Sequence, residues 1–288
     1  MPSRRTYLAG VGASVAGLAG LAGCAGSGDG TTDAPTSARY STGRSGTDTT
    51  ERSVRTHAFG ESAGGVSVSG FRHRHSVVTT AIDSSYVYEF DGQGVFVTLD
   101  ATGASDPPEV DDVSLVADGE RYPAAQFFDQ TASPSFFEGA RPYGEGDDAS
   151  SGWLVFEVPC PLSAPEARIE LGDDAWALSD DATNALAQPA PAFSLVSFDH
   201  PDEVPADEPV TLSATVEHEG GPGLLRAVFT ERVRLYNEDR VEQTVEGTAT
   251  VSVEFDDHVD APDDVDSVLL GVEGPDFSES ATVPIRRE

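Results

Sequence analysis

Short runs in which apolar and polar residues alternate cover most of the chain after residue 65. In residues 58–188 this alternation predicts strands at 66–68, 71–78, 86–88, 95–99, 114–117, 121–122, 153–158, 167–171 and 175–178. The Asp118-Gly119 pair predicts a hairpin with a two-residue turn. Ser179, an N-cap type of residue, predicts a short helix reaching residue 186. Because the period is two throughout, this region is predicted to be one β-sandwich.

A second series of alternating runs follows a stiff hinge that contains Pro189 and Pro191. The predicted strands are 193–198, 210–216, 224–229, 233–236, 248–255, 267–272 and 281–285. Seven strands in roughly 95 residues match the size of one immunoglobulin-like domain. The predicted fold class is therefore all-β, with tandem immunoglobulin-like β-sandwiches at 58–188 and 189–288.

The residues before these domains have a different pattern. A run of small and apolar residues at 8–21 is too short to span a membrane as a helix, which needs about 20 such residues. It follows Arg4 and Arg5, a pair that resembles a twin-arginine export signal. It ends in Leu21-Ala22-Gly23-Cys24, a lipobox. We therefore expect residues 1–23 to be a signal peptide and Cys24 to carry the lipid that anchors the chain to the outer face of the cytoplasmic membrane. The alternative is cleavage without lipidation, which would release a soluble secreted protein.

Residues 24–57 are rich in Gly, Ser and Thr and contain hardly any apolar side chains. Such a segment cannot bury a core, so we expect a disordered tether between the anchor and the sandwiches.

The charge of the chain is strongly negative. Fifty acidic residues oppose 17 basic ones, all of them arginine, which gives a net charge of −33. The acidic residues are spread over both predicted sandwiches, and the composition resembles that of proteins from extremely halophilic archaea. Without a basic stripe to neutralise phosphates, nucleic acid is excluded as a partner.

Residues 193–216, with Pro205 to Val210 at a turn, resemble the cell-adhesion-related (CARDB) immunoglobulin-like family. The first sandwich is more distantly similar to the telokin-like domains of exported microbial lipoproteins. These resemblances imply display, adhesion or ligand binding, with an extracellular protein, a glycan or an envelope component as partner. They imply no catalytic residue and no cofactor. A structural spacer without a ligand pocket is the alternative.

A long connection between strands is the main candidate for recognition. Its aromatic residues and one arginine are of the kinds that dominate binding hot spots, and loops on a rigid scaffold often carry recognition. The candidate residues are Phe127, Phe136, Phe137, Arg141 and Tyr143. The alternative is a lid whose phenylalanines close one end of the sandwich.

Candidates for chemistry are weaker. His73 and His75 lie two apart on one strand face, where paired imidazoles could share a metal, but no third ligand is near in sequence. An exported metal-dependent hydrolase is therefore an unfavoured alternative.

The Gly60–Gly64 segment matches the G-x-S-x-G pattern of a serine nucleophile, but a strand pattern follows it where that motif needs a helix. Cys160 is expected to be an inert packed thiol. We thus expect a protein that is not an enzyme.

Overall fold

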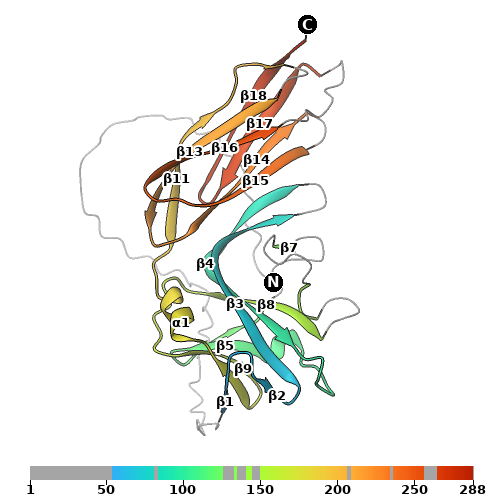
Figure 1. The fold of residues 1–288 in the computed structure, drawn as a ribbon, viewed down its shortest axis with the longest axis vertical. Helices are drawn as coiled ribbons and strands as arrows, with labels where there is room; N and C mark the ends of the chain where they lie inside the picture. Colours follow the sequence, from blue (N-terminus) through green and yellow to red (C-terminus); the bar gives the residue numbers. More distant parts are fainter. Residues whose placement is uncertain are drawn as a thin grey trace, which may run out of the picture. The chain divides into compact units, whose positions relative to one another are not determined.

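The computed structural model describes residues 54–80, 84–125, 133–134, 141–144, 150–205, 209–233, 236–255 and 265–287. Strands dominate this part of the chain, which holds one α-helix (Figure 1). The predicted all-β class, with several sheets packed as sandwiches, is confirmed. Six predicted functional residues lie outside the described residues: Arg4, Arg5, Cys24, Phe127, Phe136 and Phe137.

The first sandwich consists of two sheets. One has the strand order β1-β10-β9-β5-β6, and the other has the order β2-β3-β4-β8, with β7 also paired to β3. The strands are β1 (Arg55–Ala58), β2 (Ser62–Ala63), β3 (Val66–Thr80), β4 (Ser85–Asp100), β5 (Val113–Ala117), β6 (Glu120–Pro123), β7 (Ser133–Pro134), β8 (Ser151–Val158), β9 (Ala167–Leu171) and β10 (Asp174–Ala177). A short 3-10 helix, Val110–Asp112, precedes β5.

The strands β3 and β4 are longer than the sequence pattern predicts. The runs expected at 66–68 and 71–78 form one strand, β3, and those at 86–88 and 95–99 both belong to β4. The β3–β4 pairing shifts register twice, between Ser69 and Arg72 and between Arg74 and Ser76. A bulge interrupts alternation without ending the strand, so the sequence shows a break where the backbone continues.

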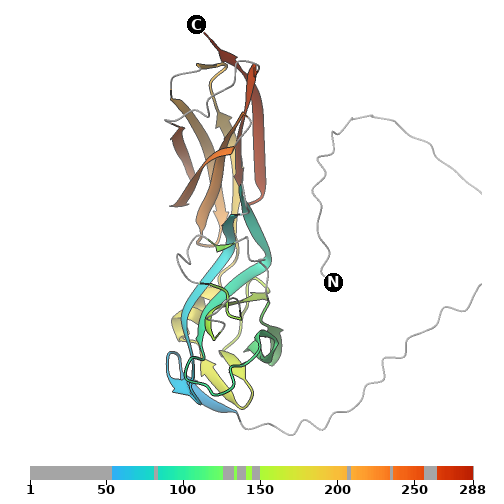
Figure 2. The ribbon, with the colours of Figure 1, turned by 90° about the vertical axis from the view of Figure 1, so that its right-hand side faces the viewer.

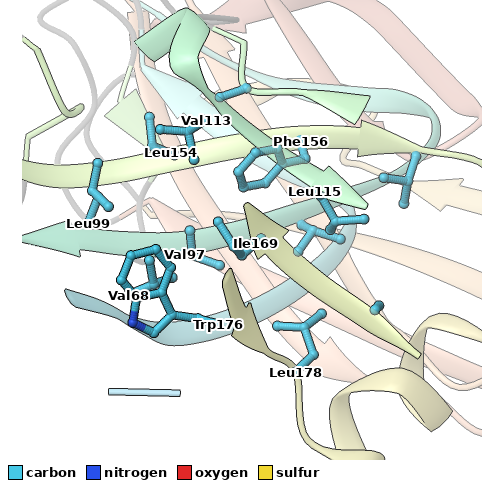
Figure 3. Packing of buried hydrophobic residues seen from close by; sticks show 14 of the residues in the cluster. Val68, Val97, Leu99, Val113, Leu115, Leu154, Phe156, Ile169, Trp176 and Leu178 are labelled. Atoms are coloured by element: carbon cyan, nitrogen blue, oxygen red, sulfur yellow. The ribbon is translucent and has the colours of Figure 1, made fainter. Parts of the chain in front are cut away.

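The two sheets enclose one apolar core, to which both contribute inward-facing residues (Figure 3). The labelled members are Val68, Val97, Leu99, Val113, Leu115, Leu154, Phe156, Ile169, Trp176 and Leu178. Trp176 has no exposed surface, and its indole N–H donates a hydrogen bond to the carbonyl oxygen of Glu61 at 2.8 Å. The ring thus joins the β10 strand to the segment before β2.

Two local predictions for this sandwich are confirmed. Asp118 and Gly119, with φ values of 50° and 78°, form the two-residue turn between β5 and β6. The helix α1 (Asp180–Leu186) begins after Ser179, whose side chain accepts a hydrogen bond from the backbone N–H of Ala182. No helix among the described residues is long and apolar enough to cross a membrane.

The second sandwich has a three-stranded sheet, β11-β13-β16, and a five-stranded sheet, β12-β18-β17-β14-β15. Its strands are β11 (Pro191–Asp199), β12 (Val204–Pro205), β13 (Val210–Gly220), β14 (Leu224–Arg232), β15 (Tyr236–Thr244), β16 (Thr248–Phe255), β17 (Ser267–Gly274) and β18 (Phe277–Arg286). A separate apolar core fills it, with Leu212, Phe229 and Leu270 among its fully buried members.

Two boundaries differ from the prediction. The strand expected at 233–236 is wrong, because β15 occupies Tyr236–Thr244 instead. Among the described strands β15 pairs with β14 alone, at the edge of its sheet, and it is mostly polar, so it has no apolar alternation to reveal it. The predicted tether was expected to reach residue 57, but Arg55–Ala58 form β1, which pairs in parallel with β10. Its polar sequence is held by backbone pairing and by a His57–Asp174 hydrogen bond of 2.8 Å.

Candidate binding site between the two sandwiches

The first residues of β4 are hydrogen bonded to the second sandwich. Glu238 accepts hydrogen bonds from the backbone N–H of Ser85 at 2.7 Å and from its hydroxyl at 2.5 Å. Glu273 accepts one from the backbone N–H of Val87 at 3.0 Å. Glu89 in turn accepts one from the backbone N–H of Asp276 at 2.8 Å. Figure 1 and Figure 2 both show this end of β4 beside strands of the second sandwich.

The carboxylates of Glu238 and Glu273 accept hydrogen bonds from backbone N–H groups at an edge of β4 that would otherwise be unpaired. β8 pairs with β4 only from Gln93 onwards, so among the described residues no strand neighbours the edge at 85–91 on that side. Unpaired N–H groups of a strand edge invite association with other chains unless they are covered. Here side-chain carboxylates of the second sandwich accept them, so the two sandwiches share a polar, directional junction.

Burial perturbs the acids of this junction. It raises the pKa of Glu273 and of Glu89 above the ordinary value. Burial alone would also raise the pKa of Glu238, but hydrogen bonds from Ser85 and Arg240 outweigh it and hold that pKa below the ordinary value. Glu238 is therefore the most firmly ionised acceptor of the three.

A cavity of about 580 Å³ adjoins this junction. The middle of β3, the adjoining part of β4, the hinge at 188–191 and the start of β14 line it. The β3–β4 pairing is irregular at this point, since Arg74 faces Gly94 whereas Ser76 faces Glu89. Bulges often occur next to functional sites because they redirect side chains. At Gly92, with φ 130°, a Cβ atom would lie 2.4 Å from the carbonyl oxygen of Val158, so this position requires glycine.

His73 and His75 both line the cavity. Their rings meet edge to face, with centroids 4.7 Å apart, which confirms that they share one face. The Nε2 atoms of both are buried and have no hydrogen-bond partner within the described ranges. Nδ1 of His75 lies 3.4 Å from the carbonyl oxygen of Gly92. Because a carbonyl can only accept, this contact assigns the proton of neutral His75 to Nδ1 and leaves a lone pair on Nε2.

Both imidazoles are held neutral at pH 7. Burial, followed by the neighbouring His75 and Arg74, lowers the pKa of His73 from 6.5 to about 4. Burial is also the main cause that lowers the pKa of His75, and Arg226 adds to it. A hydrogen bond with the Gln93 side chain partly opposes the lowering of the His73 pKa. The amide nitrogen of Gln93 donates to the carbonyl oxygens of Pro159 and Leu186.

Arg226 is the least expected residue of the site. It is only 2% exposed, and its Nε donates to Glu242 at 3.1 Å. Its Nη2 is buried, and no described residue forms a hydrogen bond with it. The sequence carries one signal for it, a charged residue inside the apolar run at 224–229. Nothing in that run indicates that Arg226 lies near His73 and His75, about 150 positions earlier in the sequence.

The electrostatics of the cavity disfavour a metal cation at the histidine pair. Arg74 and Arg226 line the same cavity, and each would repel a cation held by the imidazoles. Among the described residues, no group of three His, Cys, Asp or Glu side chains is arranged to hold a metal ion. A metal-dependent hydrolase therefore gains no support from this pair.

The recognition loop is described only in part. Arg141 is exposed, whereas Tyr143 is 2% exposed and belongs to the core of the first sandwich. The Tyr143 hydroxyl donates a hydrogen bond to the carbonyl oxygen of Pro108 at 2.8 Å. Tyr143 is thus a packing residue, while Phe127, Phe136 and Phe137 lie outside the described residues.

The surroundings of Ser62 and Cys160 differ from those of a catalytic nucleophile. Ser62 lies in β2, which forms a hairpin with β3, so a strand follows it where a nucleophile elbow has a helix. Cys160 lines the cavity, and burial raises the pKa of its thiol above the ordinary value. A raised thiol pKa reduces the fraction of nucleophilic thiolate, as expected for a packed cysteine.

No protein-family model matches the chain, and no curated protein sequence matches it. Among solved structures, one similar chain is the CARDB domain of a Pyrococcus furiosus protein, in complex with di-metal ions. The two share 13% identity and a TM-score of 0.27, over 34% of this chain and 96% of that one. The metal ions belong to that structure.

Replacing His73 with glutamine is expected to make the protein less sensitive to acid. Because the folded pKa of His73, about 4, lies below the ordinary 6.5, the unfolded chain takes up the proton first as the pH falls. Stability is therefore full above pH 6.5 and declines towards pH 4, by about 2 kcal/mol after allowance for partial solvent screening.

Denaturant unfolding at pH 7 and pH 4 measures this effect as the difference between wild type and H73Q. The raised pKa values of Glu89 and Glu273 act in the opposite direction, but they are common to both proteins and cancel. His200→Gln, outside the cavity, should follow the wild type. Equal pH dependence of wild type and H73Q would show that His73 is not held neutral by burial.

Proposed function

We propose that this chain is an exported surface lipoprotein that acts as a non-enzymatic binding or adhesion module. The observation that carries the proposal is the succession of Arg4-Arg5, an apolar run and the lipobox ending at Cys24. Three signals in this order are typical of a lipoprotein that is exported and then anchored. The lipid would hold the chain on the outer face of the cytoplasmic membrane, and residues 25–54 would serve as the tether.

The binding role is supported by the cavity beside the junction. Its polar atoms converge from β3 and β14, strands of different sandwiches, and the carboxylate hydrogen bonds at Ser85 and Val87 support the junction. Concave sites with a few convergent polar groups, often between domains, are the usual places for ligands. A protein, glycan or envelope component outside the cell would be the partner.

A structural spacer is the second candidate. The observation that favours it is the same junction, because three carboxylate-to-backbone contacts would keep two sandwiches in a fixed relation. In that case the chain would separate other envelope components without needing a ligand. Substitutions that change ligand binding without changing folding, as described below, distinguish the two functions.

Cys24→Ser is expected to move the protein from the membrane fraction to the medium, because no lipid can then be attached. Immunoblotting of membrane, cytosol and medium measures the distribution. Cys160→Ser is the matched control, since it removes the other cysteine and should leave the protein in the membrane. An unchanged membrane fraction for C24S would mean that something other than Cys24 holds the protein there.

A further inference from the structure

Arg226 presents a buried, charged donor that needs an acceptor. Its Nε already bonds to Glu242, but Nη2 has no partner in the part of the chain that the structure describes, and the residue is only 2% exposed. Folded proteins pair nearly all buried polar atoms, and an unmade bond is most costly when the group is charged. Since Arg226 lines the cavity, an acceptor that enters the cavity can complete its bonding.

Two arginines, Arg74 and Arg226, and two acids, Glu89 and Asp276, line the cavity. Arg226 lies near enough to Arg74 to lower the pKa of that guanidinium, and Glu242 offsets only part of this effect. The carboxylate of Glu89 accepts the backbone N–H of Asp276, and burial raises the pKa of Glu89. The charged donor that Arg226 still has to place bonds most strongly to an acceptor that carries negative charge, such as a carboxylate.

The same cavity also offers an acceptor that needs a donor. Nε2 of neutral His75 bears a lone pair and is buried without a hydrogen-bond partner among the described residues. A simple inorganic anion supplies no donor to this atom. A ligand that carries both a carboxylate and hydroxyl groups supplies both kinds of partner.

We propose that the cavity binds a hydroxycarboxylate, whose carboxylate accepts from Arg226 Nη2 and whose hydroxyl donates to His75 Nε2. A volume of about 580 Å³ lies within the usual range for small-molecule sites and has room for a sugar acid. Phe90 and Phe193 supply apolar wall beside the polar groups. The inference rests on the proposed binding function and gives its ligand class.

The test uses isothermal titration of the purified, detergent-solubilised chain with three probes. The probes are D-glucuronate, D-glucose and L-lactate, at constant ionic strength. Glucuronate has both the carboxylate and several hydroxyl groups, whereas glucose lacks the charge and lactate has a single hydroxyl. We expect glucuronate to bind and glucose to bind at least tenfold more weakly, because a charged hydrogen bond to Arg226 is lost.

The lactate result distinguishes two sources of the same chemistry. Much weaker binding of lactate than of glucuronate assigns the site to a sugar acid, free or at the end of a glycan. Equal binding assigns it to a small hydroxy acid. Absence of binding by both acids, or equal binding of glucose and glucuronate, would overturn the proposal.

Two variants test the residues. Arg226→Gln should weaken glucuronate binding about tenfold or more, whereas Arg286→Gln, a surface arginine paired with Glu203, should bind as wild type does. His75→Leu gives an independent test if R226Q does not fold, and it should also weaken binding. Wild-type affinity in folded H75L and R226Q would contradict the assignment. Because titration does not depend on Cys24, its outcome is separate from that of the fractionation experiment.

Discussion

Trp176→Ala is expected to lower the free energy of unfolding by about 4 kcal/mol, the largest effect of any single substitution considered for this chain. The Trp176 side chain is fully buried between the sheets of the first sandwich, so truncation leaves a large cavity (Figure 3). It also leaves the carbonyl oxygen of Glu61 without the indole N–H that it accepts. Both losses act on the folded state, and neighbouring strands can relax into the space only in part.

Denaturant titration followed by circular dichroism measures the loss, at a salt concentration at which the wild type is fully folded. Val196→Ala is the matched control, because Val196 is 59% exposed on β11 and its truncation should change stability by less than about 0.5 kcal/mol. A loss below about 1 kcal/mol for W176A would show that the first core does not depend on this ring.

Transfer from molar to low salt is expected to lower the melting temperature by about 10 °C or more. Residues 1–23 hold two arginines and no acidic residue, so the mature chain would have two more net negative charges than the −33 of the full chain. Self-repulsion of this charge opposes the compact state. The screening length is about 3 Å in 1 M salt but about 10 Å in 0.1 M salt. A loss of a few kcal/mol shifts melting by this amount in domains of this size.

Calorimetry or circular dichroism in 3 M and 0.1 M KCl measures the shift. Sucrose in low salt is the control, because it favours burial without screening charge. If sucrose restored the melting temperature as fully as KCl does, or if melting were indifferent to salt, charge repulsion would not govern stability.

The sequence predicted the fold well where one face of each strand is buried. The alternation in β13 and β16 reflects sheets with one face on a core, and Asp118-Gly119 marks its turn because both residues have positive φ. The prediction fails where a strand has no alternation of apolar and polar residues. The edge strand β15 is mostly polar, and β1 is held by pairing with β10, so neither shows a pattern.

The candidate site was predicted only in its local part. The spacing of His73 and His75 placed them on one face, and the structure confirms this. Their closeness to Arg226 depends on the packing of β14 against β3, which no local pattern encodes. The burial of Tyr143 likewise depends on a contact with Pro108, 35 positions away. The loop around it therefore cannot be assigned to binding from its composition alone.

The central claim is that the protein is exported and that Cys24 carries a lipid. Determining the first residue of the mature protein tests this most directly. Intact-mass and peptide mass spectrometry of the protein from washed membranes should find Cys24 as the first residue, with its sulfur carrying a lipid. The account predicts no peptide from residues 1–23 in that fraction. A cytosolic protein that retains these residues and has an unmodified Cys24 would contradict it.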